Sequence, residues 1–231
     1  MPDLYAVIGN PISHSKSPLI HTAFAQQTNQ SMQYDARLAP LDGFMLAVEN
    51  FRQQGGKGLN VTVPFKLEAH HLSTHLTERA KIAQAVNTLK FENNGISGDN
   101  TDGAGLIRDI ESNLGVSIAA RRILLLGAGG AARGVILPLL QQNPALLAIV
   151  NRTPHKAEAL QQQFTSHGPI VAGDLMGRCP IPRLVSRLIW VSRRGSDLSP
   201  LRLSPGSRCN RRLPGNRCSA RPRAGPRGVS D

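Results

Sequence analysis

Residues 122–150 carry the pattern that most constrains the fold of this chain. An apolar run over residues 122–126 leads into Gly127-Ala-Gly-Gly-Ala-Ala132, then into helical spacing over 133–140 and a second apolar run over 146–150. This order predicts a buried strand, a glycine turn with G-x-G-x-x-A spacing, a helix and a second buried strand. In such a unit the glycines permit a tight turn and let backbone N–H groups approach a pyrophosphate. We therefore expect dinucleotide binding, rather than a purely structural turn, at Gly127, Ala128, Gly129, Gly130 and Ala131.

The end of the second strand indicates which dinucleotide would bind. Units that bind NAD carry an acidic residue about 20 residues after the glycine turn. This chain has no acid there, and instead carries Asn151, Arg152 and Thr153, with Lys156 close by. A guanidinium pairs with a 2′-phosphate, which a carboxylate would repel. These four residues favour NADP over NAD, and a solvated polar loop is the alternative.

The first hundred residues alternate between strand and helix patterns. Strands are predicted over residues 4–8, 32–38, 58–66 and 86–91, and helices from residue 18 onward and over 41–53 and 76–84. Such alternation predicts an α/β layer, in which ligands bind at the ends of the strands. Ser15 and Ser17 precede the first helix, with Ser17 as its N-cap and Pro18 in its first position. Two hydroxyls there attract a carboxylate or phosphate, although an ordinary capped helix explains them too.

Further polar candidates lie at the predicted strand ends. Asn60, Thr62 and Pro64 share one side of the strand over 58–66, which ends at Lys66. The next strand carries Asn87, and a predicted loop over 98–103 places Asp102 ahead of a helix over 104–114. Taken one at a time, these residues are typical of a solvated strand face, a surface lysine and a helix-capping acid. They become a site only if the fold brings them together.

The formal net charge of +12 is concentrated in the last quarter of the 231 residues. Residues 176–231 contain Arg but no Lys, Glu, Gln, His, Thr, Phe or Tyr, and they are rich in Pro, Gly and Ser. We expect this tail to be poorly ordered. Three explanations of this tail compete: a basic nucleic-acid-binding extension, a disordered extension, and the product of a slipped reading frame near residues 174–180. The slipped reading frame explains the abrupt change of composition best. Its three cysteines form no C-x-x-C pair, so they predict no metal site.

The expected fold class is therefore α/β with two units. Residues 1–101 would form an α/β substrate-binding and catalytic domain, and residues 102–175 the start of a Rossmann-like NADP-binding domain that is incomplete. No apolar run reaches the roughly 18 residues of a membrane span, and no secretory signal is visible. We expect a soluble, cytoplasmic protein that takes a small-molecule substrate, binds nucleic acid at most through its tail, and is a monomer or a homodimer.

Six segments together resemble the shikimate dehydrogenase family, in family order over about residues 4–175. They are Gly9-Asn-Pro-Ile-Ser-His-Ser-Lys-Ser-Pro18, Asn60-Val-Thr-Val-Pro-Phe-Lys66, Ala85-Val-Asn-Thr-Leu89, Gly98-Asp-Asn-Thr-Asp-Gly103, Gly127-Ala-Gly-Gly-Ala-Ala132 and Asn151-Arg-Thr153. The resemblance implies NADP-dependent interconversion of 3-dehydroshikimate and shikimate, a step of chorismate and aromatic amino acid biosynthesis. It implies that Ser15 and Ser17 hold the substrate carboxylate. The ring hydroxyls would be held by Asn60, Thr62, Asn87 and Asp102, and the acid–base group would be Lys66 with Asp102 as its partner.

The sequence also departs from the family after residue 175. An Asn-Ala-Thr-Ser segment, a glycine that meets the nicotinamide and a late glutamine that reaches the substrate are all missing from residues 176–231. We therefore expect an exposed sheet edge, low stability, a tendency to aggregate and an activity that is in doubt. The alternatives are a relative that acts on quinate as well as shikimate, and an inactive dehydrogenase domain with a nucleic-acid-binding tail.

Overall fold

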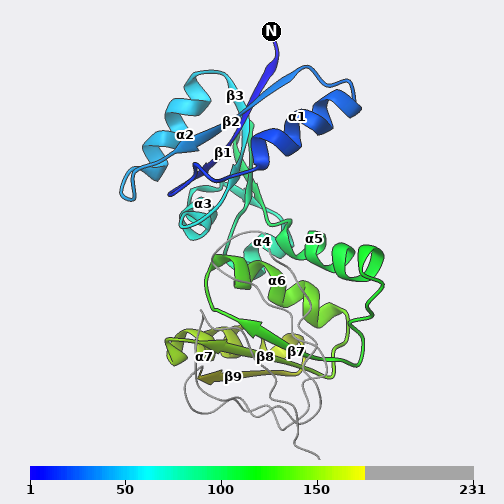
Figure 1. The fold of residues 1–231 in the computed structure, drawn as a ribbon. Coiled ribbons are helices and arrows are strands. Elements are labelled where there is room, and N and C mark those ends of the chain that lie inside the picture. The colour runs from blue at the N-terminus through cyan, green and yellow to red at the C-terminus, as the bar shows by residue number, and fades with distance from the viewer. Residues whose placement is uncertain (175–231) are drawn as a thin grey trace, which may run out of the picture.

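The computed structural model describes residues 1–174, which form two sheets at opposite ends of the molecule (Figure 1). The larger sheet has six strands in the order β2-β1-β3-β5-β6-β4, and the smaller one has three parallel strands in the order β7-β8-β9. Helices α3, α4, α5 and α6 lie between the two sheets (Figure 1). The tail predicted over residues 176–231, with its cysteines and its expected lack of order, lies outside the described residues.

The larger sheet is built by residues 3–99. Its strands are β1 (Asp3–Gly9), β2 (Met32–Leu38), β3 (Gly56–Val61), β4 (His75–Leu76), β5 (Thr88–Glu92) and β6 (Gly95–Asp99). The helices of this part are α1 (Ser17–Gln27), α2 (Phe44–Gln53), α3 (Lys66–Leu72) and α4 (Glu78–Ala83). Strands β1, β2 and β3 are parallel, whereas β5 runs antiparallel to both β3 and β6. The apolar face of α2 packs on this sheet through Phe44, Val48 and Phe51, which are buried in its core.

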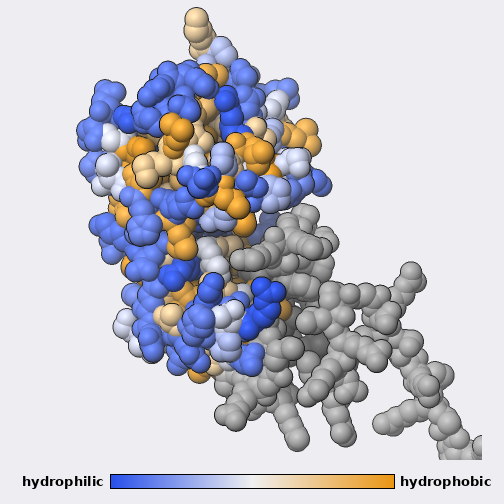
Figure 2. Space-filling view, turned by 90° about the vertical axis from the view of Figure 1, so that its left-hand side faces the viewer, coloured by the Kyte–Doolittle hydropathy of each residue, from blue (hydrophilic) through white to orange (hydrophobic). Residues whose placement is uncertain are grey.

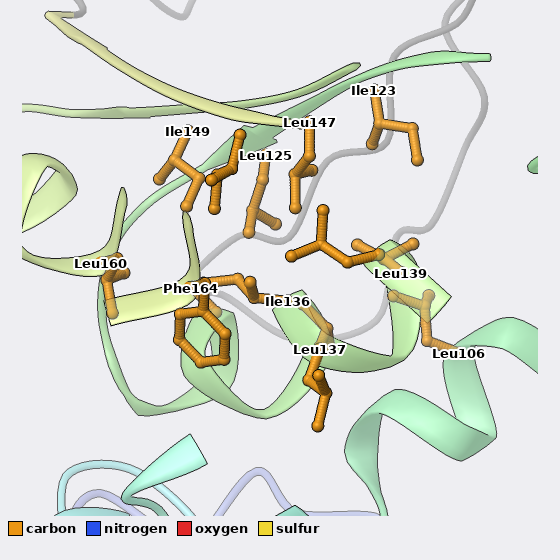
Figure 3. Close-up of a cluster of buried hydrophobic side chains, with 14 of the residues drawn as sticks. Leu106, Ile123, Leu125, Ile136, Leu137, Leu139, Leu147, Ile149, Leu160 and Phe164 are labelled. Atoms are coloured by element: carbon orange, nitrogen blue, oxygen red, sulfur yellow. The ribbon is translucent and has the colours of Figure 1, made fainter. Parts of the chain in front are cut away.

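The smaller sheet contains the glycine turn. Its elements are β7 (Arg122–Leu126), α6 (Gly130–Gln141), β8 (Leu146–Asn151), α7 (Pro154–Phe164) and β9 (Ile170–Asp174). Leu125, Leu147 and Ile149 from the strands meet Ile136 of α6 and Phe164 of α7 in one buried cluster (Figure 3). The two apolar runs of the sequence are therefore strands buried by helices, as predicted. Between the units, α5 (Asp102–Arg108) continues as a π-helical turn (Asp109–Asn113).

Most predicted elements are present, but the chain around residues 62–66 was predicted wrongly. Strand β3 ends at Val61 and not at Lys66, so Thr62 and Pro64 do not share a strand face with Asn60. The strand stops because Pro64 has no N–H to donate to a ladder, and the chain turns, with the N–H of Phe65 donating to the carbonyl of Thr62 at 3.0 Å. Lys66 then begins helix α3, which the sequence pattern did not reveal.

Other boundaries also differ from expectation. Helix α5 begins at Asp102 rather than at residue 104, so Asp102 is the first residue of the helix and does not lie in a loop ahead of it. Gly98 and Asp99 belong to β6 rather than to a loop, because they pair with Leu89 and Thr88 of β5. Helix α2 begins three residues later than predicted, at Phe44. Ser17 is the first residue of α1 and not its N-cap, since Lys16 occupies the cap position without a side-chain bond. The hydroxyl oxygen of Ser15 takes over part of the capping, because it accepts from the Ser17 N–H at 3.3 Å.

Hydrophobic side chains also remain on the surface of the larger unit. Leu19 and Phe24 of α1 and Met45 and Leu46 of α2 are exposed. Figure 2 shows apolar groups scattered among hydrophilic ones on the upper part of one face of the molecule. In the part of the chain that the structure describes, no helix is long and apolar enough to cross a membrane.

Candidate functional site

Lys66 and Asp102 form the central ion pair between the two units. Each begins a helix, Lys66 at α3 and Asp102 at α5, and the distance from Lys66 Nζ to Asp102 Oδ2 is 2.5 Å. Lys66 is only 9% exposed, which is unusual for a lysine and requires a charged partner such as this one. Its carbonyl accepts from the Val86 N–H at 2.8 Å, which fixes its backbone to the start of the segment carrying Asn87.

Asn87 holds the other oxygen of the Asp102 carboxylate. Its amide nitrogen donates to Asp102 Oδ1 at 2.8 Å and to the hydroxyl of Thr101 at 2.9 Å. Its amide oxygen accepts from the hydroxyl of Thr88 at 2.9 Å and from the backbone N–H of Thr101 at 3.0 Å. Because both oxygens of Asp102 have partners, the carboxylate is held in one orientation, with one oxygen directed to the Lys66 ammonium.

Asn60 joins the same network through Thr88. The Asn60 amide nitrogen donates to the Thr88 hydroxyl oxygen at 3.4 Å, and its amide oxygen accepts from the Tyr34 hydroxyl at 2.6 Å. A continuous row of polar contacts thus runs from Asn60 through Thr88 and Asn87 to Asp102 and Lys66. These residues come from three separate segments of the sequence, residues 60–66, 85–89 and 98–103, and the fold alone brings them together.

Ser15, Ser17 and Thr62 are not hydrogen-bonded to this row among the described residues. The two serines are half-buried at the start of α1, and among the described residues their side chains form no hydrogen bond other than the Ser15–Ser17 bond described above. Thr62 is half-buried in the turn after β3, where its backbone N–H donates to the carbonyl of Ile8 at 3.0 Å. These three side chains therefore keep polar atoms available to a ligand.

Four residues of the network were missed by the sequence analysis: Thr88, Thr101, Asn100 and Tyr34. The first three lie inside recognised motifs, within two residues of Asn87 or Asp102, so proximity in sequence was a signal for them. Asn100 is 2% exposed, and its amide oxygen accepts from the Asp102 N–H at 3.2 Å. Tyr34 belongs to no motif, and only the general need of a buried tyrosine hydroxyl for a partner could have pointed to it.

The glycine turn lies beside this ion pair. A Cβ added at Gly130, the first residue of α6, would lie 3.0 Å from the Cβ of Lys66. Gly127 has a φ of +110°, which favours glycine, and its N–H donates to the carbonyl of Val150 at 2.8 Å. Gly129 is exposed, and a Cβ added there would have nothing within 4 Å, which leaves room for a ligand against the backbone. Ala128 and Ala131 are half-buried in the same turn, and Ala132 is buried against the strands.

The residues expected to select the dinucleotide lie at the same edge of the smaller sheet. Asn151 ends β8, Thr153 caps α7, and the Asn151 amide nitrogen donates to the carbonyl of Thr153 at 3.0 Å. The side chains of Arg152 and Lys156 are exposed and form no ion pair within residues 1–174. These two cations are therefore available to a phosphate. In the same range, no group of His, Cys, Asp and Glu is placed to hold a metal ion.

Comparison with known proteins identifies relatives of both units. The family model described as the shikimate dehydrogenase substrate binding domain matches residues 7–89, and the model described as shikimate / quinate 5-dehydrogenase matches residues 109–175. Among curated proteins, the NADP(+) shikimate dehydrogenases of Nitrosospira multiformis and Nitrosomonas eutropha are 64% and 66% identical over 181 and 180 residues. These matches cover 77% and 76% of this chain but only 66% and 65% of the relatives. The chain thus spans slightly less than two thirds of their length.

Solved structures agree with this similarity. The Ael1 enzyme from Pseudomonas putida is 53% identical, with a TM-score of 0.67, over 73% of this chain and 63% of that protein. The shikimate 5-dehydrogenase of Thermus thermophilus, solved with NADP(H) and shikimate, is 28% identical, with a TM-score of 0.71, over 83% of this chain and 69% of that protein.

Proposed function

This chain belongs to the shikimate dehydrogenase family, and we propose that it catalyses the reversible, NADP-dependent reduction of 3-dehydroshikimate to shikimate. The observation that carries the proposal is the buried Lys66–Asp102 pair, 2.5 Å apart and in contact with the glycine turn. Hydride transfer to a carbonyl needs a proton donor beside the oxygen and a dinucleotide within reach. The fold brings a lysine amine and a dinucleotide-type turn together at one place.

In the reducing direction, Lys66 would act as the acid. Its ammonium polarises the carbonyl oxygen of 3-dehydroshikimate and donates a proton to it, which leaves the neutral amine to recover a proton from solvent. NADPH, when bound, supplies the hydride to the same carbonyl carbon. Asp102 accepts a hydrogen bond from Lys66 and fixes its position, and Asn87 fixes Asp102 in turn. In the oxidising direction the neutral amine takes the proton back.

The remaining residues would bind the substrate. Ser15 and Ser17 would offer their hydroxyls to the carboxylate at the N-terminus of α1, where the helix dipole also favours an anion. Asn60, Thr62, Asn87 and Asp102 would contact the ring hydroxyls. Within this scheme residues 1–101 form the substrate-binding and catalytic domain.

NADP would be held by residues 102–175, the beginning of the dinucleotide-binding domain. Gly127, Ala128, Gly129, Gly130 and Ala131 would contact the pyrophosphate, because the turn leaves the backbone open there. The exposed cations of Arg152 and Lys156, together with Asn151 and Thr153, would hold the 2′-phosphate. The expected cytoplasmic location and the monomeric or homodimeric state stay predictions.

The direct test is NADPH formation from shikimate by the full 231-residue chain. We expect turnover with NADP to exceed turnover with NAD, and we expect Lys66→Ala to lower kcat about 10²- to 10⁴-fold, the range that acid–base groups contribute. Lys57→Ala is the matched control, because Lys57 is an exposed lysine of β3 without a partner among the described side chains. Equal turnover in Lys66→Ala and the parent chain would contradict the role of Lys66. Shikimate binding without turnover by soluble, folded protein would show a binding site without catalysis.

A further inference from the structure

Tyr34 extends across the sheet to reach the candidate substrate site. It lies in the middle of β2, is 8% exposed, and its hydroxyl donates to Asn60 Oδ1 at 2.6 Å. Strand β1 separates β2 from β3, with Tyr5 opposite Tyr34 on one side and Val7 opposite Asn60 on the other. Partners in register point to the same face of a sheet, so the Tyr34 ring crosses over Val7, with which it shares a buried cluster.

The ring of Tyr34 is held on its other side by helix α1. The imidazole of His21 stacks on it with ring centroids 4.2 Å apart and planes at 4°. His21 follows one turn after Ser17, so the same helix that would bind the substrate carboxylate also holds Tyr34 in place. Burial raises the pKa of Tyr34, which keeps the phenol protonated and able to donate.

Thr88 on one side and Tyr34 on the other together decide which way the Asn60 amide faces. The Thr88 hydroxyl has a single proton, and it donates that proton to Asn87 Oδ1 at 2.9 Å. Toward Asn60 the Thr88 oxygen can therefore only accept, which requires the NH₂ group of Asn60 on the Thr88 side and its oxygen on the Tyr34 side. One side-chain N–H of Asn60 then donates to Thr88. The second side-chain N–H of Asn60 has no protein partner within residues 1–174.

We propose that Tyr34 is a positioning residue for the substrate: it holds the Asn60 amide so that its second N–H donates to a ring hydroxyl oxygen. This inference rests on the proposed function, because the hydroxyl is that of shikimate. Tyr34 itself does not touch the substrate. It acts through Asn60, and through its stacking on His21 it links that amide to helix α1, which begins at Ser17.

The test compares two ligands on three forms of the full chain. Shikimate carries ring hydroxyls, and cyclohex-1-ene-1-carboxylate has the same ring and carboxylate without them. We expect Tyr34→Phe to raise the Kd of shikimate about 2- to 10-fold, the value of one neutral hydrogen bond, and to leave the Kd of the hydroxyl-free acid unchanged. Tyr5→Phe is the matched control, because it removes the hydroxyl of the directly opposite tyrosine. Tyr5→Phe should change neither the Kd of shikimate nor that of the hydroxyl-free acid, as measured by isothermal titration calorimetry.

In the binding experiment, two outcomes would overturn the inference. Equal weakening of both ligands would assign Tyr34 a general structural role, and an unchanged Kd for shikimate would remove its role altogether. If the parent chain fails to bind shikimate, the proposed function is contradicted. The orientation of the Asn60 amide is then tested in the ligand-free protein by nuclear magnetic resonance. We expect its side-chain N–H signals, assigned with Asn60→Asp, to shift or double in Tyr34→Phe but not in Tyr5→Phe. Unchanged signals in Tyr34→Phe would contradict the positioning of the amide.

Discussion

At the scale of single residues, Asp99 is the most strongly perturbed carboxylate near the site. It pairs with Arg79, whose Nε donates to Asp99 Oδ1 at 2.7 Å, and it accepts from the Thr77 hydroxyl at 2.6 Å and the Asn100 N–H at 2.7 Å. Hydrogen bonding to Arg79, helped by Thr77 and the Asn100 N–H and opposed by burial, lowers the pKa of Asp99 from 3.8 to about 2. Asp99 therefore anchors the beginning of the short link through Asn100 that leads to Asp102 at the start of α5.

Asp99 should make the stability of the protein depend on pH in the acid range. Because its pKa is lower in the folded state, its contribution is present in full above pH 3.8 and is lost as the pH falls toward about 2. We expect Asp99→Asn to lower the free energy of unfolding by about 1 kcal/mol at pH 6, after allowance for solvent screening. In urea titrations, the difference from the parent chain should shrink between about pH 4 and pH 2. Asp42→Asn, at an exposed position, is the control, and a difference that is independent of pH would contradict this assignment.

The candidate site could be predicted residue by residue only in part. Lys66, Asp102, Asn87 and Asn60 were all named from the sequence, and the structure places them in one hydrogen-bonded row. Their individual patterns favoured surface or capping roles, and only the resemblance to a family grouped them. Tyr34 was not predictable, because its contact with Asn60 spans 26 residues and crosses an intervening strand.

At the scale of secondary-structure elements, α5 and α6 approach each other through two glycines. A Cβ added at Gly134 of α6 would lie 2.5 Å from Asn100 Oδ1, and one added at Gly103 of α5 would lie 2.5 Å from the carbonyl oxygen of Gly134. Asn100 also donates to the carbonyl of Ala85 at 2.9 Å, so a movement away from α6 would break that hydrogen bond. The close approach keeps the start of α5, with Asp102, against the dinucleotide-type unit.

Gly134→Ala should therefore destabilise the protein. The added methyl group would push α6 away from Asn100, at a cost of about 1–3 kcal/mol for overpacking a buried contact. Gly105→Ala is a matched control in α5, because a Cβ there has nothing within 4 Å, and it should stabilise the helix by about 0.5–1 kcal/mol. The two variants should shift the urea midpoint in opposite directions. A shift of the same sign in both would contradict the close packing at Gly134.

At the scale of the whole molecule, a few polar contacts join the two units in addition to the Lys66–Asp102 pair. Gln163 of α7 donates to the carbonyl of Ile82 in α4 at 2.6 Å, and its amide oxygen accepts from Arg133 of α6 at 2.8 Å. Arg133 also donates to the amide oxygen of Gln84 at 3.2 Å. Because these residues lie on both units, the relative position of the two sheets depends on them.

Gln163→Ala should loosen the junction between the units. It leaves the Ile82 carbonyl and the Arg133 guanidinium without this partner, which costs about 1–3 kcal/mol. We expect faster amide hydrogen exchange in α4 and an unchanged rate in β7 and β8. The neighbouring Gln162→Ala, at an exposed position of the same helix, should change neither. Equal exchange in the two variants would show that Gln163 does not join the units.

The sequence by itself determined the α/β class, the glycine turn and most of the strands. These features follow from local patterns: apolar runs such as residues 4–8 and 146–150 are buried strands, and the spacing from Gly127 to Ala132 specifies a tight turn before a helix. Local patterns were wrong where neighbouring strands decided the outcome. Gly98 and Asp99 are in a strand because β5 pairs with both and β4 also pairs with Gly98, and Lys66 begins a helix because Pro64 ends the ladder.

Only the tertiary structure decided how the polar residues are arranged. Side-chain contacts such as Lys66 with Asp102, Asn87 with Asp102 and Tyr34 with Asn60 join positions 15 to 36 residues apart. Their geometry depends on strand order and on the close crossing of helices at Gly134, which no local pattern encodes. A buried charge or amide is stable only when its partners are in place, so the same packing that buries Lys66 also selects Asp102 as its partner.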